Sequence, residues 1–227
     1  MVVQIVSLFP EMFRGPFQAS MIKKAQSQGL VDIRLIALRD FGIGPHNMTD
    51  DYPFGGGIGM LMRPDVVVPA VEWGQAHHHR PAQVILTTPQ GRKFDQRLAE
   101  QLSRLDHVII VAGHYEGVDE RVINLLKPME ISVGDVILTG GELAAMMIVD
   151  AVTRLIPGVL GAEDGPAEES FGKGGGLEGP QYTRPQIYRG LEVPSVLLSG
   201  DHARIIQWRH DQALERTRNR RPDLLGN

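Results

Sequence analysis

The sequence of 227 residues contains no cysteine. This absence excludes disulfides, cysteine-ligated zinc and a thiol nucleophile, and with the last it excludes RNA-modifying mechanisms that attack a pyrimidine ring through a cysteine. No apolar run approaches the roughly 20 residues that a membrane-spanning helix requires. The start, MVVQIVSLFP, has a short apolar run and no basic leader, which predicts a strand rather than a signal peptide. We therefore expect a cytoplasmic protein without a membrane partner.

Two glycine motifs of nucleotide-binding enzymes are also missing. No GxGxxG follows a predicted strand, and no GxxxxGK precedes a serine or threonine, so neither a Rossmann site nor a P-loop is supported. The chain also has no excess of positive charge, because its formal net charge is −4. This balance argues against a wholly basic nucleic-acid binder but leaves room for a local basic patch.

Short apolar runs alternate with helical patterns along the first two thirds of the chain. Such alternation predicts an α/β sheet with buried parallel strands. The predicted strands cover 1–8, 31–38, 84–87 and 108–111, and the predicted helices cover 17–28, 63–73 and 93–105. Residues 42–59 form a long glycine-rich stretch without a period, which predicts a loop. The stretch 143–156 is apolar on most faces, which predicts a helix buried between the sheet and a partner subunit.

The composition changes after residue 160. Residues 161–179 are rich in glycine and acidic residues, which predicts a linker or a mobile loop. Asp201 then predicts the cap of a helix running to about Asn219. From Arg204 to Arg221 six arginines stand against two acidic residues, a local balance of +4. This segment suits phosphate contacts with structured RNA, although an ordinary charged helix gives the same pattern.

Two glycine-laced segments, 112–121 and 131–142, each combine an apolar run with glycines. Glycine at the end of a strand lets the backbone turn sharply and lets a ligand approach bare N–H and C=O groups. Two such loops close in sequence predict one pocket built from main-chain atoms. Either loop alone is also compatible with an ordinary turn between a strand and a helix.

An ordered set of motifs connects these loops to the rest of the chain. LTTPQG occurs at 86–91, GHYEGVDER at 113–121, SVGDVILTGGE at 132–142 and PGVLG at 157–161, with VSLFPEMF, DDYPFGGG and YTRP at their expected places. In order and spacing the set resembles the bacterial tRNA (guanine-N1)-methyltransferases of the knotted SPOUT class. The resemblance covers essentially the whole chain.

The resemblance implies a fold and a cofactor. It implies a SPOUT-type parallel sheet with a deep trefoil knot, a small and mainly helical C-terminal domain, and a homodimer with its active site at the interface. The implied domains are a knotted cofactor domain over 1–160, a linker with the catalytic carboxylate over 161–179 and a tRNA-binding domain over 180–227. The implied contacts to S-adenosylmethionine come from Leu86, Gly113, Val133, Gly134, Asp135, Val136, Ile137, Leu138, Gly140 and Gly141.

The implied substrate is tRNA with guanosine at position 37. Methylation at N1 needs a base, because N1 of guanine is protonated at neutral pH, and a cation to stabilise charge on O6. By resemblance Glu169 is the base, with Glu168 as fallback, Arg154 is the cation and Glu116 orients the reacting groups. The implied substrate contacts are Asp50, Gly55, Gly56, Gly59, Ser170, Tyr182, Arg184 and Arg220.

The chain departs from the family pattern at several of these positions. Glu169 replaces the usual aspartate and is one methylene longer, which matters because proton transfer requires hydrogen-bond reach. His114 stands where arginine is frequent, Val136 where tyrosine is frequent, and Phe54 and Ile58 also differ. The family reaction is helped by Mg²⁺, which Glu116 and Glu169 would attract, but no residue is assigned as a metal ligand.

Other functions are compatible with the residues. One alternative is a SPOUT methyltransferase for another RNA position, and a second is a catalytically impaired tRNA-binding protein, suggested by Glu169. A small-molecule enzyme is disfavoured by the basic C-terminal segment. The run His77-His78-His79 predicts a solvated loop, because adjacent histidines seldom converge on one ion.

Overall fold

The computed structural model describes residues 1–161, 169–172 and 174–226. Glu168, the fallback base, lies outside the described residues. The chain divides into two compact units, Met1–Gly161 and Ala162–Asn227. Among the described residues no helix is long and apolar enough to cross a membrane.

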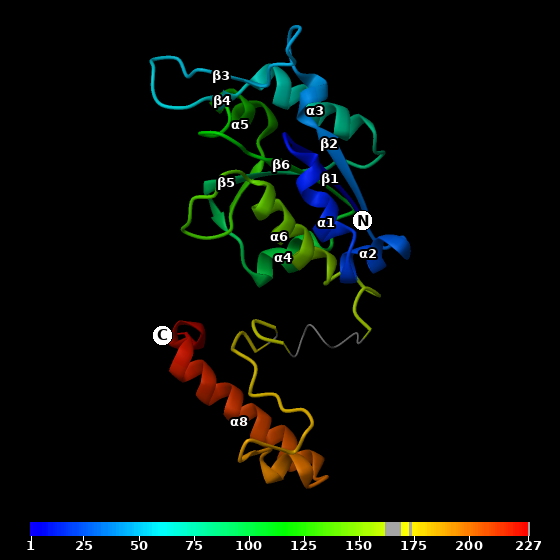
Figure 1. The fold of residues 1–227 in the computed structure, drawn as a ribbon, viewed down its shortest axis with the longest axis vertical. Coiled ribbons are helices and arrows are strands. Elements are labelled where there is room, and N and C mark those ends of the chain that lie inside the picture. The colour runs from blue at the N-terminus through cyan, green and yellow to red at the C-terminus, as the bar shows by residue number, and fades with distance from the viewer. Residues whose placement is uncertain (162–168, 173, 227) are drawn as a thin grey trace. The chain divides into compact units, whose positions relative to one another are not determined.

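The first unit is built on a five-stranded sheet in the order β2-β1-β6-β5-β7 (Figure 1). All four neighbouring pairs of strands run parallel. The strands are β1 Val2–Ser7, β2 Asp32–Ala37, β5 Gln83–Lys93, β6 His107–Ala112 and β7 Met129–Ser132. Every residue of the central strand β6 is buried, which explains its continuous apolar sequence. The predicted parallel α/β sheet is therefore confirmed.

Helices cover both faces of this sheet. One face packs against α1 (Arg14–Phe17), α2 (Ser20–Ser27), α4 (Gln96–Leu102) and α6 (Glu142–Thr153). The other face packs against α3 (Pro64–Ala76) and α5 (Glu120–Leu126). Ile5 and Val6 of β1 belong to different clusters because successive side chains of a strand point to opposite faces. The chain thus enters β6 from α4 on one face and leaves it toward α5 on the other.

Several predicted boundaries differ from the structure. The predicted helix 17–28 begins only at Ser20, because Ala19 is extended and Ser20 has a φ of 50°, and Phe17 is the last residue of the separate helix α1. The predicted helix 93–105 begins at Gln96, since Asp95 caps it by accepting a hydrogen bond of 2.8 Å from the Leu98 N–H. Within the predicted loop 42–59, β3 (Asp50–Asp51) pairs with β4 (Leu61–Met62) as a short antiparallel ladder.

Helix α6 is buried on one side only in the single chain. Ala145, Ile148 and Val149 are buried against the sheet, but Leu143 and Met147 are 53% and 50% exposed. The side of α6 that faces the sheet is therefore buried as predicted. The other side is apolar and uncovered in the single chain, and its burial by a partner subunit stays a prediction.

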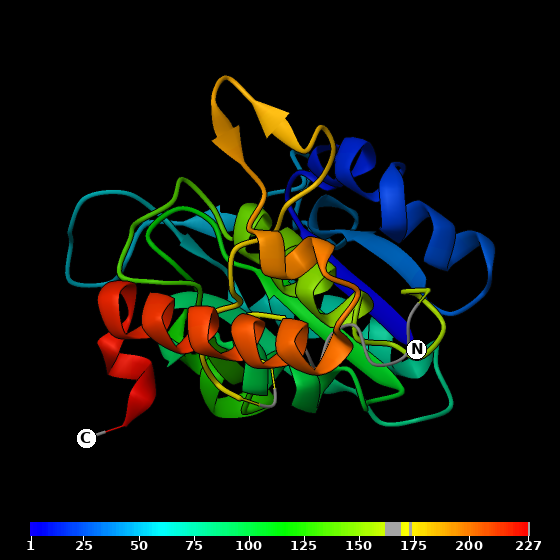
Figure 2. The same ribbon diagram turned by 90° about the horizontal axis from the view of Figure 1, so that it is seen from below.

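The second unit is built around α8 (His202–Arg220), which the sequence predicts correctly. Asp201 caps it by accepting a hydrogen bond of 3.2 Å from the Arg204 N–H. The sequence did not predict the antiparallel hairpin of β8 (Ile187–Tyr188) and β9 (Leu191–Glu192), which stands out in Figure 2. Its two turn residues, Arg189 and Gly190, have φ values of 51° and 80°, as a tight hairpin turn of two residues requires.

Candidate active site

A cavity of about 420 Å³ opens beyond the carboxyl ends of β5, β6 and β7. Its size lies within the usual range for small-molecule sites. In open α/β sheets ligands bind outside the carboxyl ends of the strands, where the connections leave to opposite faces. The helices α4 and α5 make such a change of face around β6. The cavity therefore lies where this architecture binds ligands.

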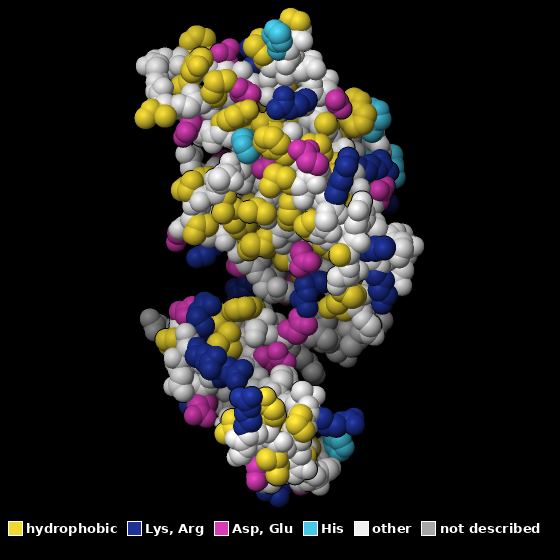
Figure 3. All heavy atoms as spheres, viewed as in Figure 1, with side chains coloured by type: hydrophobic (Ala, Val, Ile, Leu, Met, Phe, Trp, Pro, Cys, Tyr) yellow, Lys and Arg dark blue, Asp and Glu magenta, His cyan; other side chains and the backbone are white. Residues whose placement is uncertain are grey.

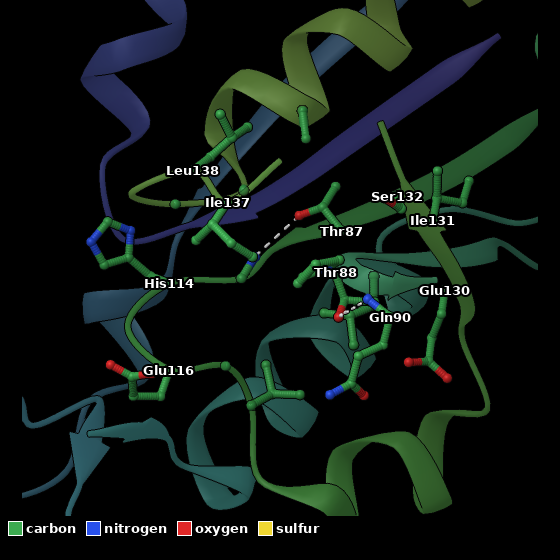
Figure 4. A pocket seen from close by; sticks show the side chains of 18 of the residues that line it. Thr87, Thr88, Gln90, His114, Glu116, Glu130, Ile131, Ser132, Ile137 and Leu138 are labelled. Carbon is green, nitrogen blue, oxygen red and sulfur yellow. Dashed lines mark hydrogen bonds between the residues drawn. The ribbon is translucent and has the colours of Figure 1, made fainter. Parts of the chain in front are cut away.

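The wall formed by β5 depends on a break in its pairing with β7. The two strands pair at Ile85–Thr87 and again at Arg92–Lys93, with a register shift between Thr87 and Arg92. A side chain at Gly91 would collide with the backbone of Glu130 and Ile131, so only glycine allows this close crossing. The excursion brings Thr88 and Gln90 to the cavity (Figure 4).

The two glycine loops are joined to each other by main-chain bonds. The Gly141 N–H donates to the Gly113 carbonyl at 2.5 Å, and His114 and Gly140 form an isolated antiparallel bridge. The Gly113 N–H donates to Thr87 Oγ1 at 3.3 Å (Figure 4). A side chain at Gly141 would collide with Thr87 Oγ1 and lie 2.7 Å from the Gly113 nitrogen. The floor of the cavity is therefore a contact between backbones.

Most residues assigned to the cofactor line this cavity. The lining includes Leu86, Gly113, Val133, Gly134, Val136, Ile137, Leu138, Gly140 and Gly141, whereas Asp135 is not part of it. The sequence assignments omitted several polar residues that also line it, among them Thr88, Gln90 and Glu130. The LTTPQG motif contains the first two, but their direction depends on the register shift of β5. Figure 4 shows Gln90 and Glu130 across the cavity from His114 and Glu116.

Glu116 lies between the cavity and the glycine-rich loop that precedes β4. Its N–H donates to the Met60 carbonyl at 3.1 Å, and its side chain also lines the cavity. A side chain at Gly59, whose φ is +84°, would collide with Glu116 Cγ and lie 2.7 Å from Oε1. Glycine at this position therefore allows the loop to touch Glu116 directly. By contrast Gly55 and Gly56 have open space around them.

The Tyr115 side chain forms a hydrogen bond with Asp50 and so connects β3 to the glycine loop 112–121. Burial raises the pKa of the Tyr115 hydroxyl, and a hydrogen bond to Asp50 raises it further. Asp50 also accepts a hydrogen bond of 2.9 Å from Thr49 Oγ1. Tyr115 has a φ of 58°, a strained value for a residue other than glycine. The structure thus brings Asp50, Gly59 and Glu116 together at one side of the cavity.

A buried carboxylate lies beneath the glycine loops. Glu142, which is 1% exposed, accepts a hydrogen bond of 2.9 Å from Ser7 Oγ. Its other oxygen, Oε2, lies 3.5 Å from His114 Nδ1, yet neither atom has a hydrogen-bond partner. The two atoms are close, but their geometry is not that of a hydrogen bond. Glu142 thereby links β1 to both glycine loops, a role that no sequence motif indicated.

Other assigned residues are not among those that line this cavity. Arg154 caps the C-terminal end of α6, 12 residues beyond Glu142, which is about 18 Å along the helix axis. Glu169, Ser170, Tyr182, Arg184 and Arg220 belong to the second unit. Within that unit the Tyr182 ring lies 6.4 Å from the Trp208 ring, and Arg220 is the last residue of α8. The first unit alone therefore does not bring Arg154 to the cavity.

The three adjacent histidines follow α3 and lie near the amino end of β6, whereas the cavity lies at its carboxyl end. His77 stacks on Trp73 at 3.9 Å, and His78 lies 4.3 Å from the ring of His107, the first residue of β6. Burial lowers the pKa of His107, and electrostatic repulsion from the neighbouring His78 lowers it further. The described residues contain no group of three or more His, Asp or Glu side chains that could hold a metal ion.

Together these features define an α/β protein with a nucleoside-sized cavity walled largely by the backbone of two glycine loops. The family model described as tRNA (Guanine-1)-methyltransferase TrmD matches residues 1–227, and the chain belongs to this family. A protein of Moorella thermoacetica is 55% identical over 227 residues, covering 98% of this chain and 89% of the relative. Relatives from Dictyoglomus turgidum and Staphylococcus epidermidis are 52% and 51% identical and cover 98% and 99% of this chain, and 89% and 91% of their own lengths. All three are named tRNA (guanine-N(1)-)-methyltransferase.

Proposed function

We propose that this chain transfers the methyl group of S-adenosylmethionine to N1 of guanosine 37 in tRNA. The observation that carries the proposal is the backbone-walled cavity at the ends of β5, β6 and β7, in a chain that the family matches over its whole length. A tRNA substrate would place the enzyme in the cytoplasm.

The cavity fits the proposed methyl donor. The lining includes Gly113, Gly134, Gly140 and Gly141, so a ligand can approach the main chain of both loops closely. The nine lining residues assigned above would hold the donor, and Asp135 would support the loop 133–138 from outside. When bound, S-adenosylmethionine supplies an electrophilic methyl group, and the surrounding wall excludes water from it.

The catalytic residues have distinct tasks in this proposal. Glu169 removes the N1 proton as the methyl group is transferred, because the protonated nitrogen is a poor nucleophile. Arg154 stabilises the negative charge that develops on O6. Glu116 orients the reacting groups from the wall of the cavity, and Asp50 with the neighbouring glycines shapes the guanine pocket. For Mg²⁺, Glu116 and Glu169 would supply carboxylates, with further oxygen ligands from RNA and water.

A homodimer is part of the proposal. The length of α6 separates Arg154 from the cavity of its own chain, so a second copy is needed to bring the two together. The uncovered Leu143 and Met147 side chains offer an apolar contact for that copy. We also propose that the passage of residues 133–141 past the Gly113 loop, before α6, closes a trefoil knot.

The second unit would grip tRNA. Arg204, Arg209, Arg218 and Arg220 are exposed along α8, and Figure 3 shows cationic side chains gathered over this helix. Contacts with phosphates release counterions, so tRNA affinity is expected to fall steeply as salt rises. Ser170, Tyr182 and Arg184 would contribute to the same interface.

The direct test is methyl transfer from labelled S-adenosylmethionine to unmodified tRNA transcripts. A transcript with guanosine 37 is expected to be methylated at N1, and the matched transcript with adenosine 37 is expected to remain unmodified. Modification mapped to another nucleotide would instead favour a different RNA target. Binding of both ligands without transfer would identify a catalytically impaired tRNA-binding protein.

Gly141→Ala is expected to abolish binding of S-adenosylmethionine. The new methyl group would collide with Thr87 Oγ1 and separate the two glycine loops. Gly15→Ala is the matched control, because Gly15 lies in α1 with nothing within 4 Å of the added carbon. Isothermal titration with S-adenosylmethionine measures the effect. Wild-type affinity in Gly141→Ala would show that the proposed donor does not occupy this cavity.

A further inference from the structure

Thr217 is the buried residue of α8, with 2% of its surface exposed. Its hydroxyl donates to the Ala213 carbonyl at 2.7 Å and accepts a hydrogen bond of 2.9 Å from the Leu177 N–H. The first bond is internal to the helix, but the second reaches a segment 40 residues earlier in the chain. Thr217 therefore ties the segment that follows Glu169 to the helix rich in arginine.

Residues 169–172 are hydrogen-bonded to residues 174–178, so fixing one of these parts positions the other. The Glu178 N–H donates to Ser170 Oγ at 3.0 Å, and the Phe171 N–H donates to the Gly176 carbonyl at 2.8 Å. The Gly172 N–H donates to the Glu169 carbonyl at 3.0 Å. Leu177, which is bonded to Thr217, lies between Gly176 and Glu178, and both of these residues are bonded to residues close to Glu169, namely Phe171 and Ser170. Residues 169–172 and 174–178 are consequently bonded to each other and attached to α8 through Thr217.

Glycines let this unit lie directly on the helix. A Cβ at Gly176 would lie 3.0 Å from Thr217 Oγ1, and one at Gly179 would lie 3.1 Å from the Arg209 carbonyl. Arg216 donates to the Glu178 carbonyl at 3.3 Å, and the Arg221 guanidinium lies 5.9 Å from the Phe171 ring centre. Glu169 itself borders a hollow of about 490 Å³ between the segment and α8.

We propose that Thr217 is a positioning residue for methyl transfer. Its hydroxyl sets the place of the Glu169 carboxylate on the same helix whose arginines would hold tRNA. Binding of tRNA and placement of the base would then be coupled, because the residues around Glu169 are attached to α8. The inference rests on the proposed function, in which Glu169 is the general base.

The test compares Thr217→Val with Thr217→Ser in the full chain. Valine keeps the shape but removes both hydrogen bonds and leaves the Leu177 N–H without its acceptor, whereas serine keeps the hydroxyl. We expect Thr217→Val to lower kcat on the guanosine 37 transcript by about 10- to 100-fold, because a displacement of about 1 Å costs up to that much. The KM for tRNA and the affinity for S-adenosylmethionine should stay within about twofold of wild type, and Thr217→Ser should retain most of kcat.

A double-mutant cycle separates positioning from general damage. In a Glu169→Gln background Thr217→Val should have no further effect on the residual rate, because the group that it positions is already gone. Equal losses in both backgrounds, or an unchanged kcat in Thr217→Val, would overturn the inference. A near-normal rate in Glu169→Gln alone would instead remove the base assignment on which it rests.

A second pair of variants tests the same contact from the loop side. Gly176→Ala places a methyl group against Thr217 Oγ1, whereas Gly174→Ala meets nothing within 4 Å. We expect kcat to fall in Gly176→Ala and to remain near wild type in Gly174→Ala. This pair decides the question if Thr217→Val does not fold, and equal rates in the two glycine variants would contradict the inference.

Discussion

Glu169→Gln is expected to lower the single-turnover rate of methyl transfer by roughly 10²- to 10⁴-fold, the usual contribution of a positioned general base. Glutamine has nearly the same shape but cannot accept the N1 proton, so tRNA and S-adenosylmethionine should still bind. Rapid-quench measurements with enzyme in excess over the guanosine 37 transcript isolate this step from product release.

Three further variants complete that experiment. Glu169→Asp should retain activity, since it keeps a carboxylate and restores the residue usual in the family. Glu192→Gln, on strand β9, is the matched control and should behave as wild type. A near-normal rate in Glu169→Gln, together with a large loss in Glu168→Gln, would move the role of base to the neighbouring glutamate.

Arg154→Ala and Glu116→Ala are each expected to lower the rate by about 10²- to 10³-fold, in line with the loss of one electrostatic group in an active site. Mixing the two inactive chains should restore activity. In a mixed dimer one site combines an intact Glu116 with an intact Arg154, and the other site lacks both. Random pairing makes half of the dimers mixed, so about a quarter of the wild-type sites should work.

Coexpression with two affinity tags, followed by rates on purified mixed dimers, measures this restoration. Arg104→Ala provides the control, because Arg104 is an exposed arginine of the same unit. Mixed dimers no faster than their inactive parents would show that Arg154 and Glu116 do not act in a site shared between chains. The homodimeric active site would then have to be abandoned.

The parallel sheet was predictable because a strand covered on both faces of the sheet has a nearly continuous apolar sequence, as β6 has. The break between α1 and α2 was not, since Ser20 adopts a positive φ without any glycine to indicate it. The hairpin of β8 and β9 also escaped prediction, because strands of two residues are too short to show a period of two.

The candidate site was predictable only where its chemistry is local. Glycine loops after strands indicated the cavity, and the family resemblance supplied the roles of Glu169, Arg154 and Glu116, which stay predictions. The contact of Ser7 with Glu142 joins residues 135 positions apart, and no local pattern announces it. The direction of Gln90 follows from a register shift in β5, which depends on its partner strand.

The backbone wall around Gly113 and Gly141 has a consequence for inhibition. An inhibitor whose affinity comes from main-chain N–H and C=O groups meets partners that a single substitution does not remove. At Gly141 a larger residue would disrupt the site itself, so an escape variant would also lose its own enzyme activity. Resistance to such a compound would have to arise from the side chains at the rim, such as Val136 or Gln90, or from increased expression. Compounds that rely on the backbone contacts are therefore the more durable choice.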